Sequence, residues 1–86
     1  MAPEAVRAEV VRAVEAAIVA ILPELSAGAI PHHRHLRELG ADSVDRVEIL
    51  LGALDRLGLD EPLARFSAVP DVASLIDLLW QRKLAS

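Results

Sequence analysis

Apolar residues recur at steps of three and four in three stretches of the chain, which predicts three amphipathic helices. The first helix is expected to open at Pro3 and to stop before Pro23, since proline suits the first position of a helix but breaks its interior. Its repeating apolar residues are Val6, Val10, Val14, Ala17, Ile18 and Ile21. The last helix is expected to follow Asp71, a favourable N-cap residue, and to run to about Lys83. Its stripe consists of Val72, Leu75, Ile76 and Leu79.

The second helix is expected to begin at Asp42 or Ser43 and to end at about Leu57. Gly58 follows it, and glycine readily adopts the left-handed conformation that terminates many helices. Asp42 and Asp45 lie three residues apart and form a pair like a capping box. Both acids also suit the positive end of a helix, so this start is well specified.

Residues 23–41 form a long connection that lacks sustained periodicity and contains two prolines and two glycines. A loop of this length in a compact domain is usually functional or held down by packing, here by Ile30, Leu36 and Leu39. A short third helix is expected to begin at Pro62. Because no strand pattern is present, the fold class is all-α, in one domain of 86 residues. The expected architecture is a four-helix bundle with three longer helices, a short third helix and a long loop between helices 1 and 2.

The second helix carries two apolar stripes when its residues are placed at about 100° per residue. The Leu50 stripe consists of Ile49, Leu50, Ala53 and Leu57. The Val44 stripe consists of Val44, Val47, Leu51 and Leu54. Polar and charged residues separate the two stripes on one side, namely Asp45, Glu48, Asp55 and Arg56. Helical periodicity alone would bury both stripes, so it does not decide which of them faces solvent.

The composition supports one aliphatic core. The chain is 53% hydrophobic and contains no cysteine, which excludes disulfides and thiolate metal sites. The longest uncharged run of the first helix, residues 16–23, is far shorter than a membrane span. We therefore expect a monomeric, cytoplasmic protein that does not enter a membrane.

The net charge of −4 is concentrated in one segment. Residues 42–61 contain six acids and two arginines, which gives −4, whereas the rest of the chain has seven acids and seven bases. A negative field of this kind repels nucleic acid and favours basic protein surfaces. Nucleic-acid binding is therefore not expected.

Ser43 is the candidate for chemistry, although a serine at a helix start most often serves as an N-cap. Asp42 can take over that capping, which frees the serine hydroxyl. A Ser-His-Asp hydrolase is not favoured, because His32, His33 and His35 all lie in the long loop and a Gly-x-Ser-x-Gly elbow is absent. The His-His-Arg-His run is expected to be a solvated loop and not a metal tract. No catalytic residue and no metal ligand is predicted.

The stretch from Leu39 to Leu50, with Gly-Ala-Asp-Ser-Val-Asp around Ser43, resembles the modification site of acyl carrier proteins. The resemblance continues through the Ile…Leu-x-x-Leu-Gly approach in the loop, Leu-Gly-Leu after the second helix and a final Ile-Asp-Leu-Leu. It implies that a phosphopantetheinyl transferase attaches a 4′-phosphopantetheine arm from coenzyme A to Ser43. Acyl groups would then be held as thioesters on the thiol of the arm, by a carrier and not by an enzyme.

The resemblance also assigns the two faces of the second helix. In acyl carrier proteins the positions that match the Leu50 stripe face the core, and those matching Val44, Val47, Glu48 and Leu51 face partner enzymes. Leu54 stands where many carriers have an acid, which makes this partner face more apolar. The expected partner-binding set is Asp42, Val44, Asp45, Val47, Glu48, Leu51, Leu54 and Asp55. The expected partners are the transferase and an acyltransferase, a ketosynthase or an HMG-CoA-synthase-like enzyme.

The helix sequence is most similar to free-standing carriers of polyketide assembly lines, in particular to the acetyl donors of β-branching cassettes. Such donors supply acetyl to an HMG-CoA-synthase-like enzyme. Two residues depart from that pattern, because Asp42 stands where these donors often have asparagine and Val47 where alanine is common. The alternative is a non-enzymatic helical adaptor that uses the same helix to bind a partner and leaves Ser43 unmodified.

Overall fold

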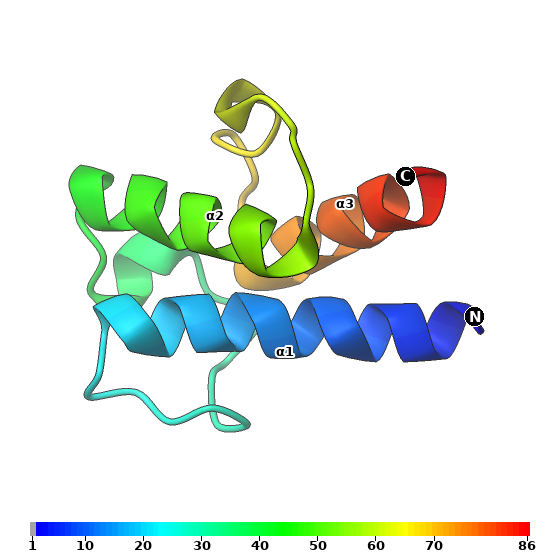
Figure 1. Cartoon of the computed structure of the whole chain (residues 1–86). Helices are drawn as coiled ribbons and strands as arrows, with labels where there is room; N and C mark the ends of the chain where they lie inside the picture. The colour runs from blue at the N-terminus through cyan, green and yellow to red at the C-terminus, as the bar shows by residue number, and fades with distance from the viewer. Residues whose placement is uncertain (1) are drawn as a thin grey trace.

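The computed structural model describes residues 2–86 and confirms the all-α fold class. No strand occurs among these residues. Figure 1 shows α1 running along one side of the molecule, with α2 and α3 packed against it. The elements are α1 (Pro3–Ile21), η1 (Leu36–Leu39), α2 (Ser43–Leu57), η2 (Leu63–Arg65) and α3 (Val72–Ala85), where η denotes a short 3-10 helix.

The predicted positions of the three long helices are confirmed. α1 and α2 begin and end where the apolar pattern places them. Asp42 is the N-cap of α2, and Gly58 ends this helix in the left-handed conformation at φ 66°. α3 follows its N-cap Asp71 and continues to Ala85, two residues beyond the predicted end at Lys83.

The predicted short third helix is a single 3-10 turn, η2, with Pro62 as its N-cap. Pro70 limits the length of any helix here, because the residue before a proline is disfavoured in the helical conformation. Glu61 holds this segment to α3, since its carboxylate accepts hydrogen bonds from Arg82 at 3.1 and 3.3 Å. The same carboxylate lies 3.3 Å from Nε of Arg65. The connection between α2 and α3 is therefore an ordered loop with one helical turn.

The long loop between α1 and α2 packs on the core at the predicted residues. Ile30 and Leu36 are buried, and Leu39 is half-buried. The end of the loop winds into η1, which the sequence pattern did not predict. His35 caps this turn, because its Nδ1 accepts a hydrogen bond from the backbone N–H of Arg37 at 2.9 Å. The loop thus reaches α2 through a defined turn.

A buried carboxylate on α1 also holds the loop. Glu15 is 8% exposed, and its Oε1 accepts a hydrogen bond from the backbone N–H of Gly28 at 2.8 Å. Its Oε2 lies 2.7 Å from Nε2 of His32. The carbonyl of His32 in turn accepts a hydrogen bond from the backbone N–H of Ala73 in α3, at 2.8 Å. The prediction that the histidine run is merely solvated is therefore wrong at His32, which bridges two helices.

One core fills the space between the three long helices and the two loops. Its fully buried side chains come from α1, α2, α3 and the segment after η2. The largest of them are Val10, Val14, Ile18, Ile49, Phe66, Val72, Leu75, Ile76 and Leu79. Within residues 2–86, no helix combines the length and the apolar composition that a membrane crossing requires.

Candidate functional site

Ser43 is the first residue of α2, at the junction with the long loop. The two neighbouring acids form the predicted capping box: Asp42 Oδ1 accepts from the N–H of Asp45 at 2.8 Å, and Asp45 Oδ2 accepts from the N–H of Asp42 at 3.3 Å. Because Asp42 caps the helix, the hydroxyl of Ser43 is not needed there. This side chain is exposed and makes no hydrogen bond within residues 2–86.

The backbone around Ser43 suits a phosphate ester. The N–H groups of Ser43 and Val44 have no acceptor among the described residues, and they lie at the positive end of the α2 dipole. A phosphodiester on the serine oxygen would meet both free donors and the dipole. The charges of Asp42 and Asp45 oppose this attraction, although the capping box turns one oxygen of each acid toward the backbone. The residues present therefore fit a 4′-phosphopantetheine group on Ser43.

Three apolar side chains of α2 are exposed in the turns that follow Ser43. Val44 is 63% exposed, Val47 44% and Leu51 50%. The acids predicted for this face are also accessible, with Asp42, Glu48 and Asp55 exposed and Asp45 half-buried. An apolar strip with a charged rim is typical of a protein-binding surface. We refer to Val44, Val47 and Leu51 with these four acids as the α2 face.

The assignment of the Leu50 stripe to the core is confirmed, since all four of its residues are buried. The assignment of Leu54 to the partner face is wrong, because this side chain is only 5% exposed and belongs to the core. Leu54 points only about 40° away from Leu50 around the helix. The chain after α2 also folds back at this point, with the N–H of Leu59 donating to the carbonyl of Leu54 at 3.0 Å. The exposed strip therefore ends at Leu51.

The side chains that would form a hydrolytic site are not hydrogen-bonded to one another within residues 2–86. His35 and Ser43 line the same cavity, but no hydrogen bond joins them. Nδ1 of His35 is occupied by the N–H of Arg37, and Oδ1 of Asp71 by the N–H of Ser74. Among the residues that the structure describes, no group of three His, Cys, Asp or Glu side chains could hold a metal ion.

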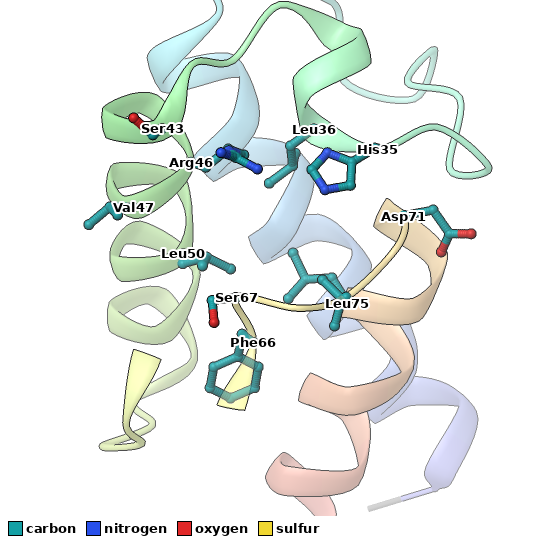
Figure 2. A pocket seen from close by; sticks show the side chains of 11 residues that line it. His35, Leu36, Ser43, Arg46, Val47, Leu50, Phe66, Ser67, Asp71 and Leu75 are labelled. Carbon is teal, nitrogen blue, oxygen red and sulfur yellow. The ribbon is translucent and has the colours of Figure 1, made fainter. Parts of the chain in front are cut away.

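Sequence reasoning did not identify a cavity of about 210 Å³ that opens beside Ser43. Figure 2 shows that its walls come from the start of α2, from η1, from the segment after η2 and from the first turn of α3. Arg46 and Phe66 contribute to these walls. Because the elements are distant in the sequence, helical periodicity gives no signal for a cavity that forms only when they pack together.

The described residues form an all-α domain with an exposed serine hydroxyl at the start of a helix. Beside the serine lies an apolar strip rimmed by acids. This is the architecture of a carrier domain. Residues 12–79 match the protein family described as "Phosphopantetheine attachment site". The chain is also similar to the polyketide biosynthesis acyl-carrier-protein AcpK of Bacillus subtilis (strain 168), with 38% identity over 65 residues. That match covers 76% of this chain and 79% of the relative. No solved structure matches the chain significantly.

The chain therefore belongs to the phosphopantetheine-attachment family of acyl carrier proteins. Members of this family are carriers and not enzymes, and they bear 4′-phosphopantetheine covalently. When bound, this group supplies a thiol that holds acyl groups as thioesters.

Proposed function

We propose that Ser43 bears the phosphopantetheine arm and that the protein carries acyl groups in polyketide biosynthesis. The observation that supports Ser43 as the attachment site is its exposed hydroxyl at the start of α2, inside the matched region 12–79, which makes no hydrogen bond to any residue that the structure describes. The polyketide context rests on the relative, whose name places it in polyketide biosynthesis.

Attachment is a phosphoryl transfer from coenzyme A. The oxygen of Ser43 attacks the phosphorus that bears the pantetheine unit, and the bond to the adenosine 3′,5′-bisphosphate leaving group breaks. The serine proton passes to a base of the transferase. The N–H groups of Ser43 and Val44 have no acceptor among residues 2–86 and support the ester that results, because free donors at a helix start are available to phosphate oxygens.

The α2 face serves as the docking surface for the transferase and for the enzymes that load and unload the arm. Its apolar centre of Val44, Val47 and Leu51 contributes buried area. Its acids, Asp42, Asp45, Glu48 and Asp55, steer basic partner surfaces and set their orientation. An acyltransferase, a ketosynthase or an HMG-CoA-synthase-like enzyme would use this same face. Leu54 is not part of it.

The narrower role is that of acetyl donor to an HMG-CoA-synthase-like β-branching enzyme. The full burial of the largest core side chains supports short cargo, because a two-carbon acetyl group needs no space between the helices. The test is acetyl transfer from the loaded protein to such a synthase, measured beside a carrier from an elongation module. Equal transfer rates would remove the donor role and leave the general carrier function.

Intact-mass measurement tests the attachment itself. The chain is incubated with coenzyme A and a broad-specificity phosphopantetheinyl transferase, beside Ser43→Ala and the control Ser67→Ala. Ser67 lies in the loop after η2 and donates its hydroxyl to the carbonyl of Ala64. One added phosphopantetheinyl group is expected on the wild type and on the control, and none on Ser43→Ala. Modification that persists in Ser43→Ala would contradict the assignment, and a wild type that stays unmodified would favour the adaptor alternative.

A further inference from the structure

The cavity beside Ser43 is apolar along most of its length. Residues of four different segments form its walls, and several of them are core residues. The apolar lining consists of Leu36, Val47, Leu50, Phe66, Val69 and Leu75. Because Leu50 lies seven residues after Ser43, the cavity follows α2 for roughly 10 Å, or two helical turns.

Arg46 places an unpartnered donor in this cavity. Its Nε is buried and makes no hydrogen bond within residues 2–86. A buried donor without an acceptor is costly, and a guanidinium is always charged. Figure 2 shows its side chain extending from α2 toward Leu36 and His35, across the cavity. The protein therefore presents a guanidinium whose Nε donor has no acceptor among the described residues.

His35 offers a second donor on the same cavity. Its Nδ1 accepts from the N–H of Arg37, so the ring proton resides on Nε2. Two further polar residues of the lining, Ser67 and Asp71, already have hydrogen-bond partners. The hydroxyl of Ser67 donates to the carbonyl of Ala64, and Oδ1 of Asp71 accepts from the N–H of Ser74. The cavity thus combines apolar walls with two unused donors.

From this arrangement we infer that the cavity binds the proximal part of the phosphopantetheine arm itself, with Arg46 and His35 donating to its oxygens. The inference rests on the proposed attachment at Ser43. The serine is part of the cavity lining, so the first atoms of the arm are the ones within reach. These are the phosphodiester, a carbon bearing two methyl groups, and then a hydroxyl and an amide carbonyl.

The chemistry of this part of the arm matches the cavity. The dimethyl carbon suits walls such as Leu50 and Phe66, and the oxygens on either side of it suit Arg46 and His35. Position also favours the contact, because residues three apart on a helix are neighbours and Arg46 is three residues after Ser43. Size agrees as well, since a cavity of 210 Å³ exceeds the ~150 Å³ that is enough for benzene. The docked arm would have to leave this cavity before a partner could draw the thiol into its active site.

The experiment uses the modified full chain and begins with intact mass, so that attachment is established separately. Nuclear Overhauser effects are then measured between the dimethyl protons of the arm and the side chains of Leu50, Phe66 and Leu75. They are expected in the wild type and should be several-fold weaker in Arg46→Met. The matched control is Arg56→Met, which changes an exposed arginine of the same helix and should leave them unchanged.

Two results would overturn the inference while leaving the attachment intact. One is a fully modified wild type without these effects. The other is a protein that shows nuclear Overhauser effects to these side chains only after the arm is loaded with a butyryl group, and from the butyryl chain instead of the dimethyl group. The cavity would then bind cargo and not the arm. A backbone spectrum of Arg46→Met that matches the wild type away from the cavity shows that loss of docking is not a loss of fold.

Discussion

Glu15 and His32 join the first helix to the long loop across 2.7 Å, between Oε2 of the acid and Nε2 of the ring. The other carboxylate oxygen of Glu15 accepts the backbone N–H of Gly28. The carbonyl of His32 reaches the first turn of α3 through Ala73. One acidic side chain therefore orders the loop that leads to Ser43 and, through that loop, the start of the last helix.

Removing this acid should destabilise the whole domain. Glu15→Ala leaves the N–H of Gly28 and the ring of His32 without their acceptor, and a loss of about 2 kcal/mol in the free energy of unfolding is expected. Chemical denaturation followed by circular dichroism measures it. Glu24→Ala is the control, because Glu24 is exposed in the same loop. Equal stability of the two variants would show that the Glu15 contacts contribute nothing.

Leu51 and Leu54 separate the partner face from the core. Leu54→Ala should lower the free energy of unfolding by about 2–5 kcal/mol, as truncation of a buried leucine usually does. Leu51→Ala removes a half-exposed side chain and should change it by less than about 0.5 kcal/mol. The same Leu51→Ala protein should be modified or acylated more slowly by partner enzymes. If both variants unfold alike, Leu51 is a core residue and the α2 face is misassigned.

Much of this architecture could be predicted from the sequence, because it depends on local rules. The ends of α1 and α2, the Asp42–Asp45 capping box and the position of Ser43 follow from periodicity, capping preferences and the resemblance to carriers. The burial of Leu54 does not, because it depends on the chain that folds back after α2. Leu54 points between the two stripes of α2, so the helical pattern did not decide whether this residue is buried.

The contacts of the long loop were harder to predict, although Glu15 gave a usable signal. It lies four residues after Val11 and three before Ile18, so it interrupts an otherwise apolar row. An acid in such a row indicates a buried carboxylate that needs partners. Its partners, however, lie 13 and 17 residues away in the sequence, and no spacing rule identifies them. The cavity lined by Arg46 was missed for the same reason.

The N-cap of α3 predicts how stability responds to acid. The hydrogen bond from the backbone N–H of Ser74, and then that from its side chain, holds the pKa of Asp71 below its ordinary value of 3.8. A carboxyl with a lowered folded-state pKa contributes stability that is fully present above the unfolded value and is lost as the pH falls through the folded one. Asp71→Asn retains a good cap but does not titrate. The advantage of the wild type over Asp71→Asn should therefore shrink as the pH falls below about 4.

Denaturation curves at several pH values between about 6 and 2 test this response. Glu38 adds a second group of the same sign, because the N–H of His35 and the nearby cation Arg34 lower its pKa from 4.5. Glu38→Gln should thus also flatten the acid limb of the stability curve. An advantage over both amide variants that stays constant down to the lowest pH would contradict the assignment.

A substitution of Arg46 can separate a role in stabilising the fold from a role in binding the phosphopantetheine arm. Its buried Nε has no acceptor in the described structure, so Arg46→Met exchanges an unsatisfied donor for an apolar side chain of similar length. We expect the free energy of unfolding of the unmodified protein to stay the same or to rise by up to about 1 kcal/mol. Chemical denaturation of the unmodified chain, beside Arg56→Met, measures it. A fall of more than about 1 kcal/mol would show that Arg46 stabilises the fold, and its place in the cavity would then need no ligand to explain it.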